Sequence, residues 1–128
     1  MATTTFPNLI PLETIPLRTV DELQACCPDL LTSEATISEE DAVLAARVFK
    51  ALSDPARVRL LSMIASSEAR EACVCDLTEP VGLSQPTVSH HLKVLHDAGL
   101  IDRERRASWV YYRLRPEAIA VVARALRV

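Results

Sequence analysis

The chain has 128 residues, 49% of them hydrophobic and 24% charged, which is enough for one folded domain with its own core. No apolar run is long enough to cross a bilayer, and the N-terminus lacks the basic and then apolar pattern of a secretory signal, so we expect a cytoplasmic protein with no membrane partner. The net charge of −3 does not exclude nucleic acid, because it is unevenly spread: residues 1–45 carry one basic and eight acidic residues, whereas residues 46–128 carry 13 basic and 9 acidic ones.

Residues 1–37 are predicted to form an N-terminal arm, ahead of a domain at residues 38–128. Prolines and a run of threonines favour an arm that is mostly extended, with one helical turn around Val20–Ala25. Cys26 and Cys27 lie side by side on this arm. Because thiols stay reduced in the cytosol, the four cysteines of the chain indicate a metal or metalloid site before a disulfide framework.

The domain is predicted to begin with two amphipathic helices. Ser38 precedes an acidic first turn, which suits the positive end of a helix dipole, and the apolar stripe of this helix ends at Leu52. Asp54 and Pro55 are typical of a cap and a first helical position, and the second helix continues to about Ser66.

A helix-turn-helix pattern follows. Asp76 is placed to cap a short third helix that runs to about Val81. After a tight turn, Ser84 caps a longer helix that Gly99 is placed to end in a left-handed conformation. A short helix, a turn and a longer helix with a polar outer face are typical of major-groove binding.

The longer helix carries side chains that can hydrogen-bond base edges and phosphates. We predict DNA contacts from Gln85, Thr87, Ser89, His90 and Lys93. An ordinary solvated helix face is the alternative, and His91 and His96 are expected to be structural rather than metal ligands.

After Gly99 the apolar period changes from that of a helix to that of strands. Residues 100–105 and 109–114 are predicted to form a β-hairpin joined through Arg106, Ala107 and Ser108. Such a hairpin beside a helix-turn-helix acts as a wing that reaches phosphates or a minor groove, and its alternative role is solubility. The expected DNA contacts on it are Arg103, Arg105 and Arg106.

A last helix begins at Pro116 and carries an apolar face formed by Ile119, Val122, Ala123 and Leu126. This face is predicted to pack on its own domain or against its twin in a second subunit. The fold class expected from all these elements is mainly α with a small β-hairpin wing: a dimeric winged helix-turn-helix, with DNA binding and dimerisation in residues 38–128.

Cys73 and Cys75 are the second candidate site. In an extended segment, residues i and i+2 point the same way, so both sulfur atoms can face one ion. The nearby helix N-terminus favours the thiolate form, and thiolates prefer soft ions. The alternative is that one of the two is simply a buried core residue.

Four segments together resemble the ArsR/SmtB family of winged-helix metal-responsive repressors: residues 49–61, 73–77, 83–95 and 109–114. The resemblance covers about residues 40–127. It implies a homodimer that sits on double-stranded operator DNA when metal-free and leaves it when metal binds.

The resemblance also implies a metal site at Cys73 and Cys75, of the kind used by arsenic-, antimony-, cadmium- and lead-responsive members. The arsenic pattern has a third cysteine on the following helix, where this chain has Thr78. Cys26 and Cys27 are expected to supply the missing sulfur. The zinc site of other members is not expected, because Glu117 is the only acidic residue of the last helix.

We therefore expect a repressor that dissociates from DNA when As(III) or Sb(III) binds cysteine thiolates. A Cd(II)- or Pb(II)-responsive repressor using all four cysteines is one alternative, and a thiol-redox sensor on the same fold is another. Catalysis is not expected, since the sequence shows no paired catalytic carboxylates, no nucleophile with its base and no glycine-rich phosphate loop.

Overall fold

The computed structural model describes residues 20–26, 29–32 and 35–127. Residues 1–19 and Cys27, on which part of the predicted arm falls, lie outside the described residues. The elements are α1 (Val20–Cys26), α2 (Glu39–Leu52), α3 (Pro55–Ser66), η2 (Glu68–Arg70), β1 (Glu71–Cys73), α4 (Val74–Val81), α5 (Gln85–Asp97), β2 (Ile101–Arg106), β3 (Trp109–Leu114) and α6 (Pro116–Ala125).

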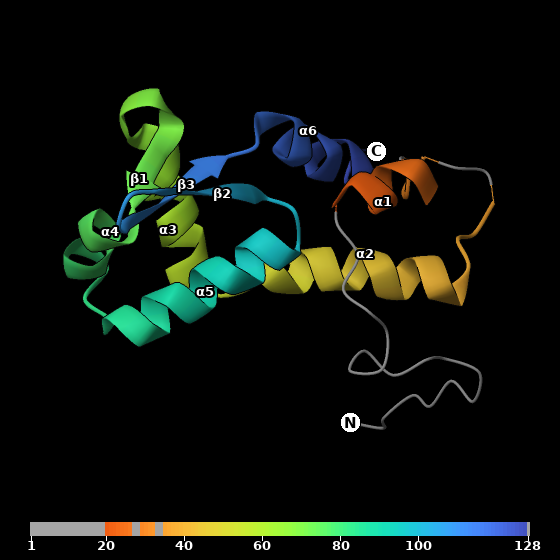
Figure 1. Cartoon of the computed structure of the whole chain (residues 1–128). Coiled ribbons are helices and arrows are strands. Elements are labelled where there is room, and N and C mark those ends of the chain that lie inside the picture. The colour runs from red at the N-terminus through yellow and green to blue at the C-terminus, as the bar shows by residue number, and fades with distance from the viewer. Residues whose placement is uncertain (1–19, 27–28, 33–34, 128) are drawn as a thin grey trace, which may run out of the picture.

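Figure 1 shows two ends to this arrangement. Helices α1 and α6 pack side by side at one end, with α1 also against α2, whereas β1, α4 and the tip of the β2–β3 hairpin lie at the other. Helix α3 packs between them, against α4, α5 and the sheet. None of the described helices is long and apolar enough to span a membrane.

The predicted caps of the first two helices are confirmed. Ser38 Oγ accepts a hydrogen bond of 3.1 Å from the backbone N–H of Asp41. Asp54 Oδ1 accepts one of 2.8 Å from the N–H of Ala56, and Pro55 occupies the first helical position. These bonds satisfy N–H groups that have no partner within their own helix, which is why α2 and α3 begin where the sequence indicates.

The third helix begins earlier than predicted. Asp76 was expected as its cap, but Cys73 takes that position and Asp76 lies inside the first turn of α4. Gly82, at φ 73°, ends α4 in a left-handed conformation. The next helix follows the prediction, because Ser84 Oγ accepts a hydrogen bond of 3.4 Å from the N–H of Thr87 and Gly99 has φ 85°.

The predicted hairpin is present, and a third strand joins it. Strand β1 pairs antiparallel with β3, so that the sheet order is β1-β3-β2. β1 was not predicted, because a three-residue strand carries too little alternation to detect. The hairpin turn consists of Ala107 and Ser108, and Ala107 adopts φ 55° where glycine is the easier residue.

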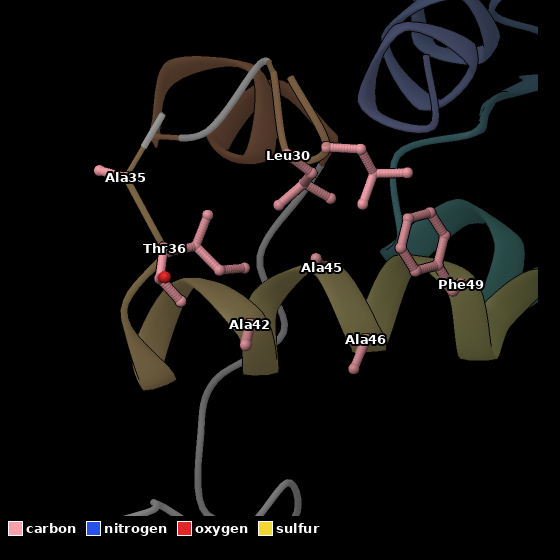
Figure 2. A pocket seen from close by; sticks show the side chains of 9 residues that line it. Leu30, Ala35, Thr36, Ala42, Ala45, Ala46 and Phe49 are labelled. Atoms are coloured by element: carbon pink, nitrogen blue, oxygen red, sulfur yellow. The ribbon is translucent and has the colours of Figure 1, made fainter. Parts of the chain in front are cut away.

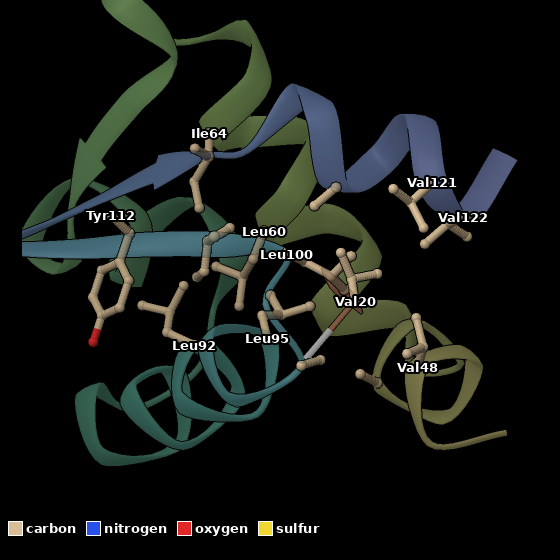
Figure 3. Packing of buried hydrophobic residues seen from close by; sticks show 14 of the residues in the cluster. Val20, Val48, Leu60, Ile64, Leu92, Leu95, Leu100, Tyr112, Val121 and Val122 are labelled. Carbon is tan, nitrogen blue, oxygen red and sulfur yellow. The ribbon is translucent and has the colours of Figure 1, made fainter. Parts of the chain in front are cut away.

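Helix α1 contributes to the core rather than standing away from the domain. Val20 and Leu23 are fully buried in the same apolar cluster as Leu95 and Leu100, and Figure 3 shows Val20 among these side chains. The N–H of Val20 donates to the carbonyl of Ala98 at 2.9 Å. The helical turn expected at Val20–Ala25 is therefore present, and it packs more firmly than an extended arm would.

Arg115 ties α1 to the rest of the fold by charge. Its Nη2 lies 3.1 Å from both carboxylate oxygens of Asp21, and its Nη1 donates to the carbonyl of Gly99 at 2.8 Å. Its Nε lies 3.1 Å from Glu117 Oε1. One guanidinium thus connects α1, the turn that follows α5 and the start of α6.

The apolar face predicted for the last helix is divided in the structure. Val122 is buried against its own domain together with Ala118, Val121 and Ala125. Leu126 and Ala123 are exposed, and Ile119 is half-buried. Helix α6 therefore packs on its own chain and still presents apolar side chains to solvent.

Candidate functional site

Cys73 and Cys75 bring their sulfur atoms together where β1 ends and α4 begins. The structure pairs them as a disulfide, with the two Cα atoms 5.2 Å apart. Cys73 is buried and Cys75 is exposed. The residues meet because Cys73 caps α4 and its Sγ accepts from the N–H of Cys75 at 3.3 Å, not because both lie in an extended segment as predicted.

Two sulfur atoms are the complete soft-ligand set of this corner within the described part of the chain. No group of three His, Cys, Asp or Glu side chains there is arranged to hold a metal ion. Thr78, at the position of the family's third cysteine, donates from Oγ1 to the carbonyl of Val74 at 2.8 Å. The carboxylate of Asp76 lies 3.9 Å from Cys75 Sγ. A three-thiolate site therefore needs a sulfur from elsewhere.

The backbone of Cys26 lies far from this corner within the same chain. Cys26 is the last residue of α1, which packs against α6 and α2. Figure 1 shows that α1 lies at the end of the molecule opposite to β1 and α4. The side chain of Cys26 and the whole of Cys27 are outside the described residues.

The predicted reading face of α5 is accessible. Its members are the exposed Gln85, Thr87, His90 and Lys93 and the half-buried Ser89. The hydroxyl groups of Thr87 and Ser84 form a hydrogen bond of 2.8 Å with each other, and Lys93 Nζ forms a 2.9 Å ion pair with Asp97. An exposed pair four residues apart on a helix is weak, so Lys93 can exchange it for another anion.

The arginines of the wing fall into two groups. Arg103 and Arg105 are exposed and form no ion pair with any described residue. Arg106 instead donates to both carboxylate oxygens of Glu71, at 2.8 and 2.9 Å, and to Glu104 at 3.1 Å. It also lies 4.6 Å from the ring centroid of Tyr111. Arg106 is thus fixed by ion pairs within the sheet, whereas Arg103 and Arg105 have no ion pair among the described residues.

Glu71 is a structural residue that the sequence did not reveal. Hydrogen bonds from Arg106 and then from Arg113 lower the pKa of Glu71 from its ordinary value of 4.5 to about 2. Arg113 Nη2 lies 3.1 Å from this carboxylate. Because Glu71 precedes Cys73 by two residues and Cys73 pairs with Tyr111, the cysteine corner is joined to the wing by backbone and by charge.

Arg57 also has a structural role. Its Nε donates to the carbonyl of Ala51 at 2.7 Å and its Nη2 to that of Lys50 at 3.2 Å, which satisfies the free carbonyls at the end of α2. Its Nη1 lies 3.1 Å from His91 Nδ1. His96 lies 3.6 Å from Asp97. These contacts agree with the expectation that His91 and His96 are structural.

A groove of about 530 Å³ runs along α2 on the side of α1. Figure 2 shows Phe49, Ala45, Ala42 and Leu30 lining it. Its lining is almost wholly apolar and contains no charged residue. It offers nothing to a phosphate or an ion, so it is separate from both the cysteine corner and the reading face.

The chain is similar to known bacterial regulators. The family model described as "Bacterial regulatory protein, arsR family" matches residues 54–103, from the cap of α3 into β2. The chain is 49% identical over 70 residues to the arsenic resistance transcriptional regulator ArsR1 of Pseudomonas putida. These 70 residues cover 55% of this chain and 53% of that relative. The chain thus matches about half the length of ArsR1. It is 37% identical over 84 residues to the arsenical resistance operon repressor of Escherichia coli, which is 66% of this chain and 70% of that repressor.

Solved structures give the same fold. The AntR antimony-specific transcriptional repressor superposes with a TM-score of 0.59 at 29% identity, over 73% of this chain and 83% of AntR. The homodimeric winged helix-turn-helix DNA-binding domain of Mb0332 from Mycobacterium bovis superposes with a TM-score of 0.56 at 29% identity, over 70% of this chain and 83% of that one. The predicted fold class is confirmed: α4 and α5 form the helix-turn-helix, and β2 and β3 form the wing.

The matched family and relatives are regulators of transcription and not enzymes. The family match runs from α3 through the cysteine corner and the helix-turn-helix as far as Arg103 in the wing, and it does not include Arg105, Arg106 or the arm cysteines. The chain belongs to the ArsR family of bacterial regulatory proteins.

Proposed function

We propose that this protein is a metalloid-responsive transcriptional repressor. As a homodimer it would bind double-stranded operator DNA when metal-free, and it would leave the DNA when As(III) or Sb(III) binds cysteine thiolates. The observation that carries the proposal is the pair of sulfur atoms at Cys73 and Cys75, on the helix that leads directly into α5. The relation to arsenic-resistance repressors and to an antimony-specific one supports the choice of ion.

DNA binding is assigned to α5 and the wing. The exposed polar groups of α5 would enter the major groove, while the free guanidinium groups of Arg103 and Arg105 would meet phosphates or the adjacent minor groove. Arg106 would orient the wing through Glu71 and contact DNA only by giving up part of that ion pair. The homodimeric neighbour and the exposed Leu126 on α6 support two such units side by side.

The metalloid site is proposed to form across two protomers. Trivalent arsenic and antimony bind three thiolates, and the corner would provide two once its disulfide is reduced. Because α1 lies at the opposite end of its own chain, the third sulfur, from Cys26 or Cys27, would come from the second protomer. An ion held in this way would pull on α4 in both halves of the dimer.

Release would follow from the position of α4. Only Gly82, Leu83 and Ser84 separate α4 from α5, so a rotation of α4 would turn the reading face out of register with the groove. The ion must bind the DNA-incompetent state more tightly for this to occur, and DNA must weaken ion binding by the same factor.

The direct test uses reduced protein and operator DNA selected by that protein from a random-sequence library. Arsenite is expected to lower operator affinity at least tenfold, a typical coupling of about 1–3 kcal/mol. Cys73→Ser should keep DNA binding and lose the response, whereas Thr78→Ser, in the same helix, should keep both. Equal operator affinities with and without arsenite would rule the mechanism out.

Mixed dimers test the arrangement of the site. One variant, Cys73→Ser with Cys75→Ser, keeps the arm cysteines, and the other, Cys26→Ser with Cys27→Ser, keeps the corner. If the site crosses the dimer, each mixed dimer contains one complete site and regains arsenite binding, while neither parent does. If the site lies within one chain, mixing restores nothing.

Two alternatives remain for the same fold. Titration with cadmium, lead and zinc separates a four-thiolate Cd(II) or Pb(II) sensor, in which all four cysteines bind, from a metalloid sensor with three. The pairing of Cys73 with Cys75 as a disulfide favours a redox sensor as the second candidate. A redox sensor would release operator DNA with peroxide alone. The mass of the non-reduced protein would then fall by two hydrogens per chain, as a disulfide forms.

A further inference from the structure

A basic pocket lies on the flank of α5, and apart from His90 its residues have no part in the function proposed above. It encloses about 290 Å³ between α2, α3 and the C-terminal half of α5. Its polar lining consists of Arg47, Lys50, Arg57 and His90, and its apolar lining of Ala51, Val94 and Ala98. No carboxylate is among these described residues, so three permanent cations and an imidazole surround one hollow.

Arg47 indicates what the hollow is for. Its Nε and Nη2 atoms are buried, and among the described residues neither has a hydrogen-bond partner. Because solvent does not reach these two atoms, the guanidinium must turn toward the hollow to meet an acceptor there. A buried guanidinium donor without an acceptor costs free energy, because it has lost water and gained nothing in exchange. Arg57 does not share this state, since the backbone carbonyls of Lys50 and Ala51 accept from it. The missing acceptor is therefore specific to Arg47.

The chemistry of the missing acceptor follows from the lining. A planar guanidinium donates in a fork that matches two oxygens of a phosphate, and an ammonium group such as that of Lys50 adds a point charge. Neutral acceptors would leave the excess positive charge unbalanced. An oxyanion of the size of a phosphate group satisfies both the geometry and the charge.

We infer that this pocket binds a phosphate group, with a backbone phosphate of the bound DNA as its source. This source rests on the proposed function. His90 belongs both to the pocket and to the exposed face of α5, so a phosphate at the edge of the major groove meets the pocket when α5 lies in that groove. A helix in the major groove has a phosphate backbone on each side. The pocket would hold one, and the wing would approach the other.

The test compares Arg47→Met with the wild type. Methionine removes both unpartnered donors and keeps an apolar side chain, so the thermal stability of the free protein should stay equal or rise. Affinity for a DNA duplex of arbitrary sequence should fall about tenfold. The slope of log affinity against log salt concentration should become shallower by about 0.9 for each pocket in the complex. Arg70→Asn serves as the charge-matched control, because Arg70 is exposed in η2, just before β1, and does not line the pocket.

A second arm uses inorganic phosphate against chloride at equal ionic strength. In one outcome, phosphate raises the melting temperature of the wild type but not of Arg47→Met, while the DNA salt slopes of the two proteins are equal. The pocket then binds phosphate, but its ligand is a free anion and not the DNA backbone. Unchanged DNA slopes together with no phosphate shift would overturn the inference. Because phosphate contacts carry no sequence information, a protein that lacks operator preference but shows the shallower slope would contradict the proposed repressor and not this pocket.

Discussion

At each end of the molecule a short element packs on the domain, and different forces hold it there. At one end, β1 is held to the wing by backbone pairing with β3 and by the ion pairs of Glu71. At the other end, α1 is held to α2 and α6 mainly by the buried side chains of Val20 and Leu23, and the Asp21–Arg115 ion pair adds to this at the surface. Apolar burial of whole side chains is worth more than ion pairs near the surface, and it does not respond to pH.

This difference suits the roles proposed for the two ends. The corner at Cys73 lies among charges and strand contacts that connect it to the wing, so a change there reaches the DNA-binding surface directly. Helix α1 is packed into the core, so it gives the arm cysteines a defined starting point. A switch needs one end that responds and one that stays in place.

The largest effect is expected at the apolar end. Leu23→Ala should destabilise the protein by about 2–5 kcal/mol, because Leu23 is fully buried and its loss leaves a cavity in the cluster that α1 shares with α5. Urea unfolding followed by circular dichroism measures the change. Leu31→Ala is the matched control, since Leu31 is 55% exposed and its truncation should change stability by less than about 0.5 kcal/mol. A cost for Leu23→Ala as small as that of the control would mean that α1 is only loosely attached.

A smaller and pH-dependent effect is expected at the charged end. The pKa of Glu71 is lower in the folded protein than its ordinary 4.5, so the ion pairs contribute fully above about pH 4.5 and are lost as the pH falls toward 2. Glu71→Gln should lower the melting temperature at neutral pH and flatten its decline between these two pH values.

Glu68→Gln is the control for that experiment, because Glu68 is exposed and forms no ion pair with the part of the chain that the structure describes. Parallel melting curves of Glu71→Gln and the wild type across the acid range would show that Glu71 does not anchor β1. Glu71→Gln also leaves Arg106 with Glu104 as its remaining carboxylate partner among the described residues, so it shows whether a less tightly held guanidinium strengthens DNA binding.

The smallest effect is expected at the wing turn. Ala107 adopts φ 55°, a conformation that costs an L-residue about 1–2 kcal/mol and glycine nothing, although glycine has a more disordered unfolded state. Ala107→Gly should therefore stabilise the protein by up to about 1 kcal/mol, measured by urea unfolding. Ser108→Gly, which relieves no positive φ, should destabilise it. A loss of stability in both variants would contradict the assigned turn geometry.

Local signals in the sequence predicted most of the helices and the hairpin. Ser38, Asp54 and Ser84 cap the helices that they were expected to cap, because a cap is a contact between residues two or three apart. Asp76 was wrongly predicted as the cap of α4, because β1 extends the chain up to Cys73 and so lets the sulfur atom take the cap position. The strand depends on β3, about 40 residues later, and no local pattern contains that partner.

The candidate site divides in the same way. The sequence indicated Cys73 and Cys75, the polar face of α5 and the wing arginines, since residue type and spacing carry that information. It did not indicate that Arg106 is held by Glu71, nor that Arg47 lacks an acceptor in the described part of the chain, because both depend on groups from separate elements.

The sequence by itself determined most of the helix ends and the helix-turn-helix with its wing, because caps and periodicity act over a few residues. Only the tertiary structure decided that α1 is part of the core, that β1 joins the sheet, and that α1 and the cysteine corner lie at opposite ends of the molecule. These features come from burial and from pairing between segments distant in sequence, and such forces act only once the chain has folded.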